Sequence, residues 1–291
     1  MVKNARAAGY LLVPVLVLAL ALRLAPWEQN HFLEDEALYS YWGLQIAHGA
    51  DPLLAEEPVD KPPLYPYVLA LSFLLFGPTE TAARLPSLLA SMAAIALTFG
   101  LARELSRYAP GRDRWREAQI GLLAALLLAL SPFDILFAST AFTDPLLNAL
   151  VLGALVASAR KRLGIAGMLA GLAAATKQHG LLYLPLIVAL GLVAIHRSPT
   201  SAGRRTGDTP GLVSEARAGD WLRALRARPW LSFVLGFAVI ATGVVYWELA
   251  RPQEPGFWQQ GLLSYGGIGL AAGAELPSRL LEWSRLLSAA W

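Results

Sequence analysis

Seven long apolar stretches constrain what this chain can fold into more than any other feature of its sequence. A helix that crosses the hydrocarbon core of a membrane needs about 20 mostly apolar residues. Stretches of this kind lie at residues 8–27, 82–102, 118–138, 144–159, 163–176, 181–195 and 230–250. Hydrophobic residues make up 56% of the chain and charged residues 15%, whereas a soluble domain carries about 25% charged residues. The sequence therefore predicts an all-α polytopic membrane protein with about seven transmembrane helices.

Two segments leave alternatives open. Residues 163–176 and 181–195 form either one over-long helix or a hairpin of two short helices, and residues 64–77 form either a further span or a helix at the membrane surface. Lys and Arg concentrate on the cytoplasmic side of membrane proteins. Most of the 24 basic residues fall on one side only if 163–195 is a hairpin and 64–77 lies at the interface. We therefore expect seven spans, with the N-terminus in the cytoplasm and the C-terminus outside.

This topology makes residues 1–291 one transmembrane domain, which we expect in the plasma membrane. Residues 28–81 form a first extracytoplasmic loop with juxtamembrane helices, and residues 196–229 form a cytoplasmic loop. Residues 251–291 form an extracytoplasmic loop or the start of a further span. Residues 1–27 also resemble a signal peptide. We favour an uncleaved span there, because the apolar run is longer than a typical signal core.

The first outer loop carries most of the functional information. It is rich in acidic residues, and residues 34–48 have a helical pattern that places Leu38, Trp42 and Ile46 on one face. Gly49 is a natural stop, because glycine tolerates the left-handed conformation that follows many helices. The pattern predicts an amphipathic helix at the membrane surface with aromatic anchors.

The helix opens with Glu34, Asp35 and Glu36. One interpretation is structural, because the free N–H groups and the dipole at a helix N-terminus attract negative charge. The other is a carboxylate pair at the membrane face that acts as a general base or holds a metal ion.

A stiff, proline-rich segment follows, and it contains Lys61 between Asp60 and Pro62-Pro63. A residue before proline is held in extended conformation, so the backbone at Lys61 is restricted. The segment is either a turn with a snorkelling lysine or a site where a lone ammonium group meets a lipid phosphate.

Four further charged residues lie at the outer ends of the predicted spans. Asp134 and Asp144 end the third span and begin the fourth, and ionisable groups in membrane segments are functional candidates. Thr143-Asp144-Pro145 is also a common helix start, with Asp or Thr as the N-cap. Arg84 and Lys177 are either interfacial anchors or parts of an anion site, for which the planar fork of Arg is well suited.

Several other functions lack their signatures. The sequence contains no Cys, which excludes disulfides, thiol catalysis and Cys-metal sites. It has no P-loop and no HExxH motif, and Gly266-Gly267-Ile268-Gly269 lacks the strand–helix context of a dinucleotide site. The histidines on the outer side do not have metal-ligand spacing. The net charge of +3 does not indicate a nucleic-acid partner, because the basic residues cluster beside the apolar runs.

Taken in order, five short motifs resemble those of the polyprenyl-phosphate-sugar-dependent glycosyltransferases with the GT-C fold. The similarity is to the bacterial branch related to the protein O-mannosyltransferases and to the aminoarabinose transferase of lipid A. It covers about residues 8–195. The motifs are Asp35-Glu36-Ala37, Asp60-Lys61-Pro62-Pro63-Leu64-Tyr65, Arg84-Leu85-Pro86-Ser87, Thr143-Asp144-Pro145-Leu146 and Ala175-Thr176-Lys177.

The resemblance implies a role for each candidate residue. Asp35 is similar to the first-loop acid that activates the acceptor or helps to place a divalent metal, and Glu36 is its neighbour in the acidic pair. Lys61 resembles the lysine that contacts the lipid phosphate of the donor. Asp144 resembles a second acid in the same cavity, and with Asp35 it is a candidate metal ligand. Arg84 and Lys177 are further candidates for binding the donor phosphate.

The implied reaction matches the chemistry of these residues. The acceptor hydroxyl loses a proton as it attacks, which requires a carboxylate, and the departing phosphate gains negative charge, which requires Lys or Arg. Mg²⁺ or Mn²⁺ held by carboxylates could share the second task. The family is expected to invert the anomeric centre, and the other partners would be membrane lipids and an acceptor.

Two other functions stay open. Short helices paired around Lys177 resemble the broken helices of secondary transporters, so a transporter or lipid flippase is the alternative. A non-catalytic scaffold leaves the acidic loop and the Asp60–Pro63 segment unexplained. Glycosyltransferases of this fold have more spans, and residues 279–291 resemble the lead-in to another one. We therefore expect the chain to be the N-terminal part of a longer protein.

Overall fold

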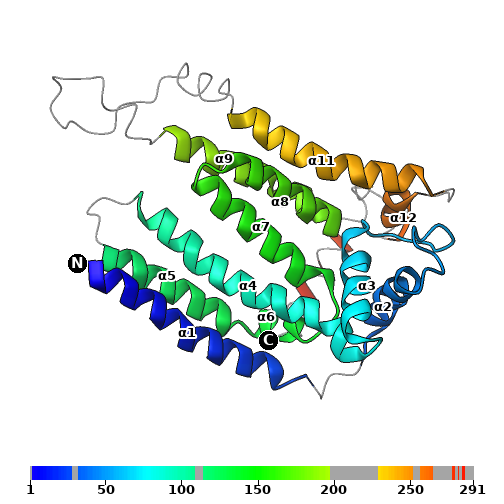
Figure 1. Ribbon diagram of the computed structural model, residues 1–291, viewed down its shortest axis with the longest axis horizontal. Coiled ribbons are helices and arrows are strands. Elements are labelled where there is room, and N and C mark those ends of the chain that lie inside the picture. Colours follow the sequence, from blue (N-terminus) through cyan, green and yellow to red (C-terminus); the bar gives the residue numbers. More distant parts are fainter. Residues whose placement is uncertain are drawn as a thin grey trace.

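The protein is a bundle of helices, seen here in a computed structural model (Figure 1). The structure describes residues 2–27, 32–108, 114–196, 229–251 and 256–264, together with 277–278, 281 and 284–285. Within these residues the regular elements are helices, with no strand. The all-α membrane fold predicted from the sequence is therefore confirmed. The predicted loops 196–229 and 251–291 lie largely outside the described residues.

Most helices of the bundle run alongside one another, and three shorter ones gather at one end (Figure 1). We call this the α2 end. The helices of the bundle are α1 (Val2–Leu24), α4 (Glu80–Ser106), α5 (Arg114–Ala129), α7 (Thr143–Ala159), α8 (Leu163–Thr176), α9 (Leu184–His196) and α11 (Pro229–Leu249). The α2 end contains α2 (Glu34–Ala47), α3 (Leu64–Phe76) and α12 (Phe257–Ser264).

The lengths of the apolar helices vary widely. Glu80–Ser106, Gln178–His196 and Trp230–Leu249 are long and apolar enough to cross a membrane. The pair Arg114–Ala129 and Pro132–Ala138 makes a fourth crossing if it is counted as one broken span. The remaining predicted spans correspond to shorter apolar helices, at Tyr10–Leu24, Thr143–Ala159 and Leu163–Thr176. Helix length alone therefore accounts for three or four of the seven predicted spans.

Residues 163–195 form a hairpin rather than one long helix. Helix α8 ends at Thr176, Lys177 is extended, and a 3-10 turn at Gln178–Tyr183 leads into α9. A Cβ at Gly180 would lie 2.5 Å from the carbonyl carbon of Ala173, and one at Gly191 would lie 3.2 Å from the side chain of Leu163. The two helices are therefore antiparallel, which confirms the hairpin predicted from the charge distribution.

Helix α8 packs closely against α11 through glycines. A Cβ at Gly167 would lie 2.0 Å from the carbonyl oxygen of Phe233, and one at Gly236 would lie 2.3 Å from the carbonyl oxygen of Gly164. Small residues allow such backbone approach in membrane helix pairs. The glycine face of 163–176 is thus a packing surface.

The third predicted span is not the single helix expected over 118–138. It breaks after Ala129, and Pro132–Ala138 (α6) turns away by 62°. The cause is local, because the hydroxyl of Ser131 caps α6 by accepting a hydrogen bond from the backbone N–H of Asp134, and Pro132 occupies the first turn. Proline fits a first turn but not a helix interior.

Arg23 stabilises this break from the end of α1. Its guanidinium is fully buried and donates to the hydroxyl of Ser91 at 2.7 Å and to the carbonyl of Ala129 at 3.1 Å. It also forms an ion pair with Asp134, which accepts a hydrogen bond from Ser91. The freed carbonyls at the end of α5 thus gain a donor, and the predicted candidate Asp134 gains a structural partner.

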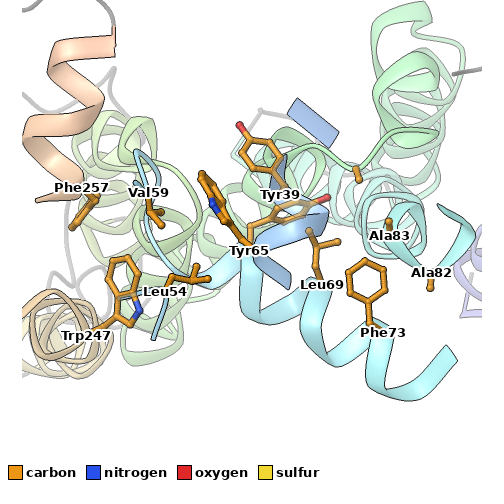
Figure 2. Packing of buried hydrophobic residues seen from close by; sticks show 12 residues of the cluster. Tyr39, Leu54, Val59, Tyr65, Leu69, Phe73, Ala82, Ala83, Trp247 and Phe257 are labelled. Atoms are coloured by element: carbon orange, nitrogen blue, oxygen red, sulfur yellow. The ribbon is translucent and has the colours of Figure 1, made fainter. Parts of the chain in front are cut away.

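The α2 end has its own apolar core, built around aromatic rings (Figure 2). Tyr39 of α2 meets Tyr65 of α3 edge to face, with ring centroids 5.9 Å apart. A Cβ at Gly43 would lie 2.8 Å from Leu69, so α2 and α3 are in close contact. Of the face predicted for α2, Trp42 is fully buried whereas Leu38 is exposed, because α2 packs against α3. Gly49 has the left-handed backbone that the sequence predicted, with φ of 69°.

Candidate functional site

A buried ion pair between Glu36 and Arg84 holds the α2 end together. Arg84 Nε donates to Glu36 Oε1 at 3.2 Å, and both side chains are buried. The same oxygen accepts the backbone N–H of Ala141 at 2.7 Å, and Oε2 accepts that of Leu33 at 3.0 Å. Arg84 Nη1 donates to the carbonyl of Trp27 at 3.1 Å. Glu36 therefore connects the first loop, α4 and the turn before α7.

Asp35 comes directly before Glu36 in the sequence, but its side chain lies on the exposed side of α2. Its side chain is exposed, and it forms no hydrogen bond or ion pair with any residue that the structure describes. Because Glu36 is fixed on the next position, the backbone that carries Asp35 is fixed as well. The predicted acidic pair is thus divided into one buried carboxylate and one that is open to a ligand.

Asp144 and Lys177 form the second ion pair at this end. Lys177 Nζ donates to Asp144 Oδ1 at 2.8 Å, and both side chains are partly exposed. Helix α7 begins at Thr143, and Phe142 is its N-cap without a side-chain hydrogen bond. The alternative in which Asp or Thr caps this helix is therefore wrong. Asp144 instead reaches across to the turn of the α8–α9 hairpin.

Lys61 forms the third ion pair, with its neighbour Asp60. The Lys61 side chain is buried, and its ammonium group donates to Asp60 Oδ2. Gln178 Nε2 donates to the backbone carbonyl of Asp60 at 2.8 Å. Because Gln178 follows Lys177, this bond brings the Asp60–Lys61 segment next to the hairpin turn. The structure therefore places the two predicted lysines on adjoining segments.

Tyr65, at the start of α3, is fully buried. Its hydroxyl is 3.1 Å from the hydroxyl of Ser87, which donates to the carbonyl of Phe142. Burial raises the pKa of Tyr65, and the negative charges of Glu36 and Asp144 raise it further. Tyr65 therefore stays neutral and connects α3, α4 and the start of α7. The sequence reasoning gave it no role, although Tyr65 and Ser87 both lie in the motifs quoted above.

An apolar groove of about 580 Å³ lies between α3, α4, α7 and α8. Leu85, which follows Arg84, and Leu146, two positions after Asp144, form part of its wall. From there it passes along α3, α4, α7 and α8, with a lining that includes Leu71, Leu75, Leu89, Leu97, Leu150 and Leu169. A hydrocarbon chain in this groove would keep a polar head group at the α2 end.

The described residues do not form a metal site of their own. No three His, Asp or Glu side chains gather within that part of the chain. Asp144 is engaged by Lys177, which leaves it poorly placed as one of only two protein ligands. We therefore derive no step through a metal ion, and the metal-binding role of Asp35 and Asp144 stays a prediction.

The structure groups the predicted residues into two sets. Lys61 pairs with Asp60 and Lys177 pairs with Asp144, and both of these acids are partly exposed, whereas Glu36 and Arg84 pair with each other in the interior. The sequence did not predict a role for Arg251. It lies after α11, is buried, and binds the backbone of the first loop. Its sequence context, at the end of an apolar run, is the same as that of any interfacial anchor.

Comparison with known protein families gives a match over just under half of the chain. Residues 60–202 match the family described as dolichyl-phosphate-mannose-protein mannosyltransferase. This range contains Lys61, Arg84, Asp144 and Lys177. Searches of the curated proteins and of the solved structures gave no significant match. The family match and the all-helical membrane fold together support a GT-C fold membrane glycosyltransferase, with residues 60–202 as the part of the chain that carries the match.

Proposed function

We propose that the chain transfers a sugar from a polyprenyl-phosphate donor to an acceptor on the extracytoplasmic face of the plasma membrane, with inversion at the anomeric carbon. The observation that carries this proposal is the position of two lysines, each held by an acid, on adjoining segments at the α2 end, together with an apolar groove along α3, α4 and α7. This arrangement matches an amphipathic substrate that has a phosphate at the end of a long hydrocarbon chain.

Donor binding is assigned to Lys61 and Lys177. Their ammonium groups lie on adjoining segments at the α2 end, and phosphate oxygens accept strong hydrogen bonds from such cations. Asp60 and Asp144 hold the two ammonium groups in place. The isoprenoid tail lies in the groove between α3, α4 and α7. As the bond between the anomeric carbon and the phosphate oxygen breaks, the lysines stabilise the charge that develops on the phosphate.

Asp35 is assigned as the general base. The acceptor hydroxyl forms a bond to the anomeric carbon while its proton moves to the Asp35 carboxylate, and the electron pair of the breaking bond leaves with the polyprenyl phosphate. Glu36 and Arg84 were predicted as a catalytic acid and a phosphate ligand. Their contacts instead favour positioning roles, because Glu36 already accepts three hydrogen bonds and Arg84 donates to Glu36 and Trp27.

The distribution of charge supports the orientation in the membrane. The end opposite α2 carries Arg103, Arg107 and the exposed turn Arg160-Lys161-Arg162. Lys and Arg concentrate on the cytoplasmic side. We therefore propose that this end faces the cytoplasm and the α2 end faces outward.

Labelling of single cysteines tests this orientation. The chain contains no Cys, so each introduced thiol is a unique reporter. Leu53 is exposed at the α2 end and Arg162 at the opposite end. In intact cells we expect a membrane-impermeant maleimide to label Leu53→Cys, and to label Arg162→Cys only after permeabilisation. The reverse pattern would reject an extracytoplasmic site.

Replacement of Lys61 tests the donor site. Membranes that contain the chain are incubated with radiolabelled sugars linked to polyprenyl phosphate, and both the transferred sugar and the released polyprenyl phosphate are measured. Lys61→Ala should reduce transfer by about 10²–10³-fold, the usual loss when one stabiliser of a developing negative charge is removed. Lys161→Ala, which removes an exposed lysine at the opposite end, should change it by less than about twofold.

The same assay separates the proposal from its alternative. Wild-type transfer that survives Lys61→Ala would reject the site assignment. Movement of the labelled lipid across the bilayer without a transfer product would favour a flippase or transporter. Comparing the donor sugars that are consumed identifies the sugar. Repeating the assay with a chelator, and then with Mg²⁺ or Mn²⁺ restored, tests the predicted metal dependence.

A further inference from the structure

Arg251 connects the end of α11 to the first loop. Its guanidinium donates from Nε to the carbonyl of Leu54 at 2.8 Å and from Nη2 to the carbonyl of Glu57 at 2.9 Å. Glu248 lies 3.3 Å from Nη1, and the guanidinium stacks over the ring of Trp247 at 4.4 Å. The side chain is 3% exposed. These bonds span nearly 200 positions of the sequence, from the last long helix to the segment before Lys61.

The loop that Arg251 binds has a specific backbone conformation. Leu54 is fully buried with φ of 52°, in the left-handed region that a leucine rarely occupies. The carboxylate of Asp51 accepts the backbone N–H groups of Ala55 and Glu56, at 2.8 and 2.9 Å. A residue keeps such a conformation when its surroundings determine it. The bond from Arg251 to the Leu54 carbonyl is part of these surroundings.

The end of α11, next to Arg251, also determines which helix packs over Asp60. Glu248 Oε1 accepts the backbone N–H of Phe257 at 2.8 Å, which fixes the start of α12. A Cβ at Gly261 would lie 3.2 Å from both the carbonyl oxygen of Asp60 and Nε2 of Gln178. Helix α12 therefore packs directly on the bond that joins the Lys61 segment to the hairpin turn.

We propose that Arg251 is a positioning residue for the donor phosphate site, an inference that rests on the proposed function above. By fixing the carbonyls of Leu54 and Glu57, Arg251 holds the chain that leads to Lys61, so that the ammonium group meets the phosphate without a prior rearrangement. Arg251 lies outside the segment that matches the family, so the role comes from its contacts in this chain. Loss of the two hydrogen bonds from Arg251 to the loop should weaken donor binding more than it slows the chemical step.

The test uses the full chain in detergent micelles, with undecaprenyl phosphate as the probe and native mass spectrometry to measure the bound fraction. Arg251→Gln should raise the Kd by about tenfold, as expected when charge-assisted hydrogen bonds to the loop are lost. In the transfer assay, KM for the donor should rise by a similar factor while kcat changes by less than about twofold. Arg114→Gln is the matched control, because Arg114 is exposed at the opposite end.

Two further variants separate positioning from charge and from folding. Arg251→Lys keeps the charge but lacks the planar fork that places Nε on the Leu54 carbonyl and Nη2 on the Glu57 carbonyl, so its Kd should stay close to that of Arg251→Gln. Glu248→Gln is a milder change that weakens the hold on Arg251, and a rise of about threefold is expected. A spin label on Leu53→Cys, which is unique in this cysteine-free chain, should become more mobile when Arg251→Gln is added.

Several outcomes would reject the positioning role of Arg251. Full recovery of binding by Arg251→Lys would reject the positioning role of Arg251. An unchanged Kd or an unchanged spin-label mobility in folded Arg251→Gln would reject it as well. A fall in kcat with unchanged KM would also overturn it. If the wild-type chain bound no undecaprenyl phosphate, the proposed function would fail and this role with it, whereas binding by the wild type and by Arg251→Gln alike would reject only the role of Arg251.

Discussion

Asp35→Asn should reduce the rate of sugar transfer by about 10²–10⁴-fold, the range in which a general base contributes to catalysis. Asn keeps the size of the side chain and its exposed position on α2 but cannot accept the proton of the acceptor hydroxyl. Donor binding should change by less than about twofold, because the two lysines that we propose as phosphate ligands are untouched. The measurement is kcat in the membrane transfer assay, together with the Kd for undecaprenyl phosphate.

The control for this change lies one position away. Glu34 is an exposed acid in the same first turn of α2, so Glu34→Gln removes the same charge from the same helix end. Transfer by this variant should stay within about twofold of the wild type. If the two variants lost activity equally, the general charge of the helix start, rather than one carboxylate, would be responsible. If Asp35→Asn kept wild-type activity, Asp144 would become the stronger candidate for the base.

Glu36→Ala should reduce the free energy of unfolding by about 3–5 kcal/mol, the usual cost of leaving a buried charge without its partner. The substitution removes the carboxylate that pairs with Arg84 and that accepts the backbone N–H groups of Leu33 and Ala141. We expect this loss to appear as a lower midpoint of thermal unfolding in detergent. Adding Arg84→Met should recover part of it, because no buried charge is then left unpaired.

Glu80 provides the comparison for this experiment. Among the described residues it is a second acid near Arg84, at 3.9 Å, but its side chain is 65% exposed. Exposed pairs contribute about 0–1 kcal/mol, so Glu80→Gln should leave the unfolding midpoint nearly unchanged. A Glu36→Ala protein that is as stable as Glu80→Gln but inactive in transfer would contradict the positioning role. It would restore the catalytic role that the sequence predicted for Glu36.

The sequence predicted those features that depend on local pattern. The apolar stretches have the composition of membrane helices, and each one contains helix. Gly49 predicted the end of α2 because few other residues adopt its backbone angles. The hairpin at Lys177 followed from the distribution of basic residues, since only a reversal of the chain brings 160–162 and the arginines after 196 to the same side. The family resemblance followed from short motifs in order.

The rest depends on contacts between distant segments, which pattern alone does not provide. Glu36 and Asp35 are adjacent acids at a helix start, and only the approach of Arg84, 48 positions later, makes one of them buried. Arg23 and Asp134 each read as interfacial charges within apolar runs, and the bend that joins them shows itself only through Ser131 and Pro132. The loop bonds of Arg251 have no sequence signal, because they go to backbone carbonyls.

The Arg23–Asp134 pair also sets an order of events while the protein is made. The partners lie 111 positions apart, and chains grow at roughly 5–20 residues per second. For several seconds, therefore, the first helix carries a guanidinium group whose carboxylate has not yet been synthesised. An unpaired arginine is costly inside lipid, so during this interval it has to remain at the head groups or beside the insertion machinery. The first helix thus reaches its final depth only after the chain has grown past Asp134.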